Sequence, residues 1–342
     1  MHANWQRYLQ SVGARIENHS VRHFGDPEAE LRAVQTGTVL CNLSHFGLLH
    51  FSGEDSRAFL HSQLSSDVQK LTALTAQFSS YCTPKGRVLA SVLLWQAGEA
   101  YIAQLHGDLL DSIRNRLAKF ILRSRVKIDN ASDTHVSVGL AGKNAEAVAK
   151  KNWGAIPLQV HGAAHNQSSV LIRLAPDRFQ ITCTVKEAPA LWEKLMRGAT
   201  PAGCGCWDWL NIRSGIPVIT PATQELFVPQ MLNLEIIGAV SFNKGCYPGQ
   251  EVIARTQHLG TPKRRTYLAN IQSENSPQPG EDLFSGDTQD QTCGMIINAA
   301  ISPEDGHDVL AVIQIGSARD GNVHWKSPAG PVLKLLPLPY TV

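Results

Sequence analysis

Apolar and polar residues follow one another in the N-terminal part of the chain in a pattern that predicts mixed strands and helices. Short apolar runs bounded by turn residues are typical of strands, and they occur at 46–51, 77–81, 87–95, 100–105 and 126–128. Helical spacing predicts helices at 27–35, after Ser52 and Gly53, and at 108–122. The last of these carries one apolar stripe, formed by Leu109, Ile113, Leu117, Phe120 and Ile121.

A second unit repeats the order strand, helix, strand, strand, helix. Its predicted strands lie at 135–140, 170–174 and 179–184, and its predicted helices lie at 144–151 and 188–196. The repeated order favours two open-faced α+β sandwiches. The glycine-rich segment 198–205, GATPAGCG, is interpreted as a hinge.

After residue 265 the pattern changes to short strand-like runs with no helical spacing between them. These runs lie at 266–271, 293–299, 309–315 and 332–335, separated by sequence rich in Gly, Pro, Ser and Asp. Such spacing favours a small β-barrel. The chain is therefore predicted to be an α+β protein with units at 1–130, 131–262 and 263–342.

The composition is that of a globular protein. The chain has 342 residues, of which 43% are hydrophobic, so extensive disorder is excluded. Its 31 basic and 29 acidic residues give a formal charge of +2, which argues against a protein that coats DNA. Residues 1–20 lack the apolar core of a secretory signal, and no apolar run is long enough to span a bilayer. We therefore expect a soluble, cytoplasmic protein without a membrane partner.

The chain contains seven cysteines, and an odd number without a secretory signal argues against a disulfide framework. Most are expected to be small buried hydrophobic residues. Cys204 and Cys206 form a C-x-C pair, which lacks the spacer of common zinc sites. No permanently bound metal is predicted.

One segment, 241–251 with sequence SFNKGCYPGQE, concentrates unusual chemistry. Gly245 and Gly249 permit backbone conformations that other residues resist. Pro248 fixes its φ angle and lacks an N–H donor. Together these residues predict a rigid turn that exposes Cys246.

The surroundings of Cys246 favour its thiolate. If residues 250–255 form a helix, the sulfur lies just before the positive end of that helix and two residues from Lys244. Glu251 works in the opposite direction. The alternative is that Cys246 is a packed loop cysteine without a chemical role.

The octapeptide 244–251, KGCYPGQE, resembles the signature of the YgfZ family of folate-binding proteins, which are relatives of the glycine-cleavage T-protein, an aminomethyltransferase. Other segments that fit the family include LSHFGLL at 43–49, PKGR at 84–87, RSRV at 123–126, FVPQ at 227–230, NLE at 233–235 and PLPY at 337–340. The resemblance covers nearly the whole chain.

The resemblance implies a T-protein-like ring of the two α+β units and the C-terminal β-barrel around a central cavity, where tetrahydrofolate would bind. It also implies an accessory factor for iron–sulfur cluster assembly or repair in client enzymes, including tRNA methylthiolation enzymes. The partners would be folate and iron–sulfur client or carrier proteins, and the link to tRNA modification would be indirect. A single thiolate is too few to hold a stable cluster, so ligation would be transient.

The resemblance also assigns residues to roles. Cys246 and Lys244 carry over as the candidate catalytic residues, with Lys244 favouring the thiolate. The rest of the motif loop carries over as Gly245, Tyr247, Gly249, Gln250, Glu251 and Arg255. Phe46 and Trp207 fall at positions where the family has folate-contacting tryptophans. An aromatic face there could stack on a pterin, whereas Trp207 could equally be packed in the core.

Two departures from the T-protein bear on activity. The carboxylate position of the transferase holds Leu89 here, and an aliphatic side chain cannot accept a proton, which argues against aminomethyltransferase activity. Arg213 replaces a glutamate that accepts hydrogen bonds from the pterin, and an arginine has no acceptor. Arg213 could instead contact a pterin carbonyl or stack on the ring.

Two alternative functions remain open at this point. The first is a folate-dependent one-carbon transferase or demethylase that uses a carboxylate from elsewhere in the cavity. The second is a tRNA- or protein-binding module without catalysis, for which the basic run 263–265 is the candidate contact.

Overall fold

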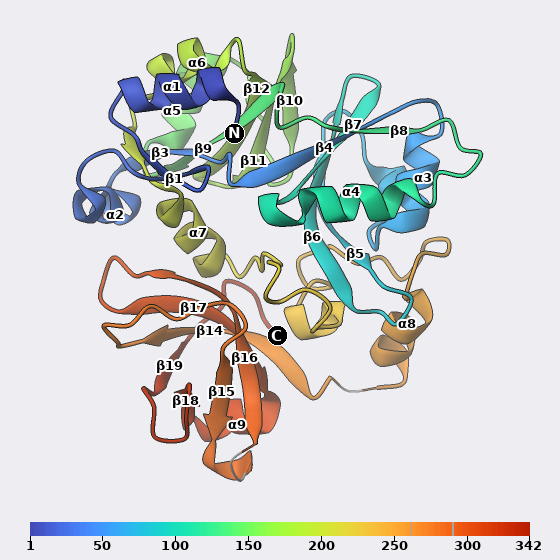
Figure 1. Ribbon diagram of the computed structural model, residues 1–342, viewed down its shortest axis with the longest axis vertical. Coiled ribbons are helices and arrows are strands. Elements are labelled where there is room, and N and C mark those ends of the chain that lie inside the picture. The colour runs from blue at the N-terminus through green and yellow to red at the C-terminus, as the bar shows by residue number, and fades with distance from the viewer. Residues whose placement is uncertain (261, 289–290) are drawn as a thin grey trace. The chain divides into compact units, whose positions relative to one another are not determined.

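The computed structural model describes residues 1–260, 262–288 and 291–342 (Figure 1). The chain forms two compact units, each built from separate stretches of sequence. Unit 1 comprises Met1–Phe59, Gln69–Gln77 and Leu93–Trp207, and unit 2 comprises Leu60–Val68, Phe78–Val92 and Asp208–Val342. The predicted boundaries at residues 130 and 262 stay a prediction.

A six-stranded sheet with the order β10-β11-β12-β9-β3-β13 organises much of unit 1. Its strands are β3 (Thr38–Asn42), β9 (His135–Gly142), β10 (Ala163–Asn166), β11 (Ser169–Ala175), β12 (Arg178–Thr184) and β13 (Thr200–Ala202). All neighbours are antiparallel except β13, which runs parallel to β3. A short hairpin of β1 (Arg15–Glu17) and β2 (Ser20–His23) stands apart.

One face of this sheet is covered by helices. These are α1 (Ala3–Ser11), α5 (Ala145–Trp153) and α6 (Ala188–Leu195), drawn together in Figure 1. Alternate residues of β9, at 136, 138 and 140, point into the core beside Phe179 and Trp192. Helix α2 (Pro27–Thr36) has Asp26 as its N-cap and Gly37 as its C-cap, and it agrees with the helix predicted at 27–35.

A five-stranded sheet has the order β5-β6-β7-β4-β8. Its strands are β4 (Phe46–Ser52), β5 (Ala76–Cys82), β6 (Val88–Ala97), β7 (Ala100–His106) and β8 (Lys127–Asn130). Helix α3 (Ser56–Gln63) follows β4 in the chain, and helix α4 (Leu110–Ala118) lies between β7 and β8. The chain passes from one unit to the other within β5 and β6.

The C-terminal part of unit 2 is a six-stranded sheet with the order β18-β15-β16-β17-β14-β19. The strands are β14 (Arg264–Ile271), β15 (Asp282–Ser285), β16 (Thr292–Ile301), β17 (His307–Gln314), β18 (Val323–Trp325) and β19 (Leu333–Leu336), with helix α9 (Ile315–Asp320) beside them. A bridge between His324 and Val332 links the two edges, so the sheet curls back on itself around Trp325. The α+β class and the curled C-terminal sheet confirm the predicted fold.

Two sequence predictions are wrong in detail. The helix predicted at 108–122 ends at Ala118, where Lys119 caps it, and Phe120 is 47% exposed instead of lying on the buried stripe. Beyond the cap, Leu122 takes a left-handed φ of 46°, which is not a helical conformation. The segment interpreted as a hinge at 198–205 instead contains β13 and the start of helix α7 (Cys204–Arg213).

Within the described part of the chain, no helix combines the length and the apolar character needed to cross a membrane.

Candidate functional site

The motif segment folds as a loop followed by helix α8 (Gln250–His258), and we refer to residues 241–249 as the cysteine loop. Gly249 precedes the helix in a left-handed conformation with a φ of 84°. A Cβ atom at this position would lie 2.5 Å from the carbonyl oxygen of Thr83 and 2.6 Å from Cα of Gly86. Two glycine backbones thus pack against each other, which explains why the loop needs Gly249.

Gly245 differs from Gly249. Its φ angle is not positive, and a Cβ atom there would meet only Nε2 of His61, at 3.7 Å. The prediction that both glycines need special backbone freedom is therefore right for Gly249 and wrong for Gly245.

The cysteine loop exposes its thiol. All seven cysteines lie in the described ranges, and Cys246 is exposed whereas the other six are buried. Burial raises the pKa of Cys82 to about 12 and that of Cys183 to about 12. Cys246 is thus the thiol most accessible to reagents and to partner molecules.

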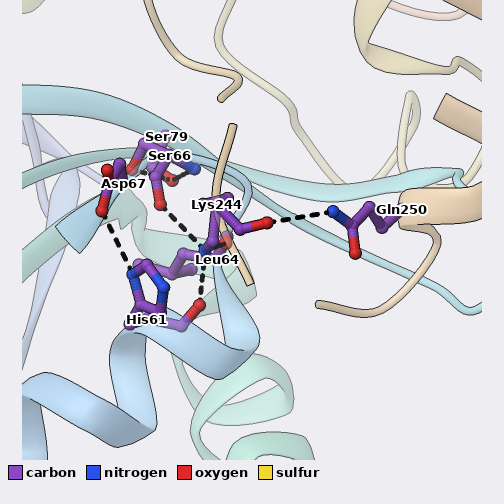
Figure 2. A network of polar contacts seen from close by, with 7 residues as sticks. All are labelled: His61, Leu64, Ser66, Asp67, Ser79, Lys244 and Gln250. Carbon is purple, nitrogen blue, oxygen red and sulfur yellow. Dashed lines mark hydrogen bonds and ion pairs between the residues drawn. The ribbon is translucent and has the colours of Figure 1, made fainter. Parts of the chain in front are cut away.

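Lys244 binds backbone carbonyl groups at the end of α3 (Figure 2). Its Nζ donates to the oxygen of Leu64 at 2.6 Å, to that of Ser66 at 3.0 Å, and also to that of His61. Burial lowers the pKa of Lys244 to about 8, although the carboxylate of Asp67 raises it. The ring of Tyr247 lies under the ammonium, with Nζ 5.0 Å from the ring centroid.

A buried imidazole and a carboxylate lie close to each other beside this lysine. Nδ1 of His61 lies 3.4 Å from Oδ1 of Asp67, and both side chains are mostly buried. Burial lowers the pKa of His61, the charge of Lys244 lowers it further, and Asp67 raises it. His61 and Asp67 were not predicted as site residues, because both are far from Lys244 in sequence and only the fold brings them together.

Hydroxyl groups support the segment that Lys244 contacts. Oγ of Ser66 donates to Oγ of Ser79 at 2.7 Å, and Oγ of Ser65 donates to the carbonyl oxygen of Ala239 at 2.7 Å. Ser241, at the start of the cysteine loop, donates its N–H to the carbonyl oxygen of Ser65. The loop is therefore built against residues 60–68 within unit 2.

The remaining residues of the motif differ in burial and in their hydrogen bonds. Tyr247 is buried, and burial raises its pKa; its hydroxyl has no hydrogen-bond partner among the described residues. Nε2 of Gln250 donates to the carbonyl oxygen of Lys244 at 3.4 Å. Glu251 and Arg255 are exposed on α8.

The predicted folate-contacting aromatic residues are buried in unit 1. Phe46 lies on β4 with its ring against His45, and Trp207 on α7 is 1% exposed. The guanidinium carbon of Arg178 lies 4.0 Å from the centroid of the Trp207 ring. A Cβ at Gly139 would lie 2.4 Å from the same ring. Trp207 is thus packed in this structure, and its role in binding stays a prediction.

Arg213 ends α7 and pairs with a carboxylate from β17. Its Nη1 lies 3.5 Å from Oδ2 of Asp308, and its guanidinium lies over the ring of Trp209. The arginine side chain is 38% exposed, whereas that of Asp308 is 3% exposed. Asp308 was missed by sequence analysis, although a lone acidic residue within the apolar strand HDVLAVIQ was a signal for a buried charge.

Leu89 is buried in β6, and its backbone carbonyl accepts a hydrogen bond from Nε2 of Gln224. Among the described residues, no group of three or more His, Cys, Asp or Glu side chains could hold a metal ion.

Comparisons with known proteins define the class and the family. The family model described as GCVT N-terminal domain matches residues 6–168. The structure of aminomethyltransferase T of the glycine cleavage system from Bartonella henselae superposes with a TM-score of 0.81 at 17% identity, covering 100% of this chain and 98% of that chain. The fold is therefore that of aminomethyltransferase T.

Relatives that are similar in sequence identify the family within this fold. The tRNA-modifying protein YgfZ of Sodalis glossinidius is 31% identical over 92% of this chain and 97% of its own length. That of Yersinia enterocolitica is 30% identical over 89% of this chain and 93% of its own length. The chain belongs to the YgfZ family.

Proposed function

We propose that this protein is a cytoplasmic, folate-binding accessory factor for iron–sulfur cluster assembly or repair in client enzymes, including tRNA methylthiolation enzymes. The observation that carries the proposal is the exposed thiol of Cys246 on a loop held by Gly249 and Lys244. The name of the relatives, tRNA-modifying protein, supports a connection to tRNA.

The chemistry proposed for Cys246 is transient ligation. Its thiolate donates an electron pair to an iron atom of a cluster that a client or carrier protein also holds, and the thiol proton passes to solvent. A stable cluster needs several thiolates, whereas the other cysteines of this chain are buried. The cluster is therefore cargo in this proposal, and the remaining ligands come from the partner.

Folate binding is proposed from the family and the fold. Arg213 presents donors without acceptors, so it suits a carbonyl or carboxylate group of the ligand better than the amino group of a pterin. Its partner Asp308 leaves part of the guanidinium exposed. Phe46 and Trp207 are the proposed aromatic contacts, and Arg178 would have to move for the covered face of Trp207 to receive a ring.

The test of the Cys246 role uses a strain from which the gene has been deleted. Plasmids supply the wild type, Cys246→Ser, or Asn243→Ala, an exposed neighbour in the same loop that serves as control. Methylthiolated nucleosides in tRNA are measured by mass spectrometry. We expect Cys246→Ser to match the deletion strain and Asn243→Ala to match the wild type. Full methylthiolation with Cys246→Ser present would remove the proposal.

The test of folate binding is calorimetric titration with tetrahydrofolate under anaerobic conditions. Trp207→Phe keeps an aromatic ring in a packed position, whereas Arg213→Gln removes the exposed charge. We expect wild-type binding to be weakened by Arg213→Gln. Absence of any heat of binding to the wild type would contradict the folate part alone.

A further inference from the structure

The amino group of Lys244 has three N–H donors, and each has a backbone carbonyl partner in the structure. We propose that Lys244 is a positioning residue, whose ammonium binds the carbonyl oxygens of His61, Leu64 and Ser66 and thereby holds the cysteine loop in place. The proposal rests on the proposed function only in that the loop carries the Cys246 thiol. It gives Lys244 a role separate from any direct effect on that thiol.

Of the three carbonyl groups, that of His61 lies in the last turn of α3, and those of Leu64 and Ser66 lie in the segment after the helix. The N–H of Ser65 would continue α3 by bonding to the carbonyl of His61, but it donates to the carbonyl oxygen of Ser80 instead. Carbonyl groups in the last turn of a helix lack intrahelical partners and carry the negative end of the helix dipole. A cation that binds there donates a hydrogen bond to a carbonyl oxygen that has no partner within the helix.

The lysine is also fixed from its own side. Its carbonyl oxygen accepts a hydrogen bond from Gln250, the first residue of α8, and its ammonium lies over the buried ring of Tyr247. Ser241 attaches the start of the cysteine loop to Ser65, and Gly249 packs its end against Gly86. Lys244 supplies an attachment in the middle of the loop, two residues before Cys246.

The charged and titratable groups around Nζ come from each element packed against it. His61 flanks it from the last turn of α3, Asp67 from the segment after that helix, and Tyr247 lies below it from the loop. Asp67 favours the ammonium, whereas burial disfavours it. The carbonyl oxygens accept only from a donor, so a neutral methylene chain of the same length cannot replace the lysine.

The experiment compares Lys244→Ala, Lys244→Met and the control Lys334→Met, an exposed lysine on β19 in the same unit. Amide hydrogen exchange of the cysteine loop and the rate of alkylation of Cys246 by iodoacetamide against pH are measured on the full chain. We expect exchange in the loop to be faster by about tenfold or more in both Lys244 variants, since each loses charge-assisted hydrogen bonds. Lys334→Met should resemble the wild type.

Chemical rescue separates an ammonium site from a general loss of packing. Lys244→Ala leaves room for propylammonium, which carries the missing carbons and the same three donors. We expect propylammonium chloride to restore slow exchange in Lys244→Ala, and tetramethylammonium chloride at the same ionic strength to leave it fast, because it has no N–H. Equal effects of the two salts would overturn the proposal.

The alkylation profile distinguishes positioning from activation of the thiol. If Lys244 positions the loop, its replacement changes the limiting rate at high pH and leaves the midpoint of the profile in place. A shifted midpoint with unchanged loop exchange would overturn the proposal and favour direct stabilisation of the thiolate. If Cys246→Ser proves silent in the methylthiolation assay while rescue succeeds, the proposed function fails and the positioning role stands.

Discussion

The indole nitrogen of Trp209 donates a hydrogen bond to Oδ2 of Asp308 at 2.8 Å, which joins helix α7 to strand β17. Nδ2 of Asn270 donates to Oδ1 of the same carboxylate at 2.8 Å. Arg213 forms an ion pair with the carboxylate through Oδ2. Because Asp308 is buried, these partners together compensate for a buried charge. The carboxylate therefore organises the end of the helix that carries Arg213.

Replacement of this carboxylate should be costly. Asp308→Ala leaves the indole N–H of Trp209 without its acceptor and removes one of the two acceptors of Nδ2 of Asn270, which still donates to the carbonyl oxygen of Asp305. We therefore expect the free energy of unfolding to fall by about 3 kcal/mol. Urea unfolding followed by tryptophan fluorescence measures the change. Asp320→Ala, at an exposed position on α9, is the control and should stay within about 0.5 kcal/mol of the wild type. Similar values for the two variants would show that the buried network contributes nothing.

The ion pair of Arg213 and Asp308 determines the effect of a glutamate at position 213. Arg213→Glu places a second carboxylate beside Asp308, so the single variant should be less stable than the wild type. Adding Asp308→Asn removes the repulsion. If a carboxylate at position 213 can clamp a pterin, the double variant should bind tetrahydrofolate about tenfold more tightly than the wild type in calorimetry. Unchanged affinity would show that Arg213 does not occupy a folate-contacting position.

Local sequence signals predict most of the regular elements. The apolar run at 135–140 identifies β9, and the helical spacing at 27–35 identifies α2. The end of α4 could not be predicted from the pattern, because Phe120 and Ile121 continue the apolar stripe although the helix has already ended at Ala118. Strand β13 was missed because its residues, TPA, form a strand only beside β3.

The site was predicted where the chemistry is local and missed where it is assembled from distant segments. The motif 244–251 predicts an exposed cysteine, and Cys246 is exposed in the structure. The partners of Lys244 are backbone carbonyl groups of residues 61–66, which no side-chain pattern reveals. The contact between Arg213 and Asp308 joins residues that only the fold brings together.

The two glycines of the cysteine loop should respond differently to a methyl group. Gly249→Ala forces a Cβ to within 2.5 Å of the carbonyl oxygen of Thr83 at a φ of 84°, so we expect a loss of about 2 kcal/mol in the free energy of unfolding. Gly245→Ala meets its nearest neighbour at 3.7 Å and should change stability by less than about 0.5 kcal/mol. Thermal and urea unfolding of both variants measure the difference, and equal losses would contradict the packing of Gly249 on Gly86.

The burial of His61 predicts how stability depends on pH. Burial and the charge of Lys244 hold the pKa of His61 below its usual value of 6.5, while Asp67 raises it. As the pH falls through 6.5, the unfolded chain therefore takes up a proton at this residue before the folded chain does, and the free energy of unfolding decreases. This contribution is complete above the unfolded pKa and is lost on acidification.

The measurement is urea unfolding at neutral and at mildly acidic pH for the wild type and His61→Gln. We expect the wild type to lose more stability than the variant on acidification. Lys244→Met removes one of the charges that oppose protonation, so the pKa of His61, followed by NMR of its ring protons, should rise in that variant. A pKa that stays in place would mean that the lysine charge does not reach His61, and the arrangement of the ammonium between the imidazole and the carbonyl groups would then need revision.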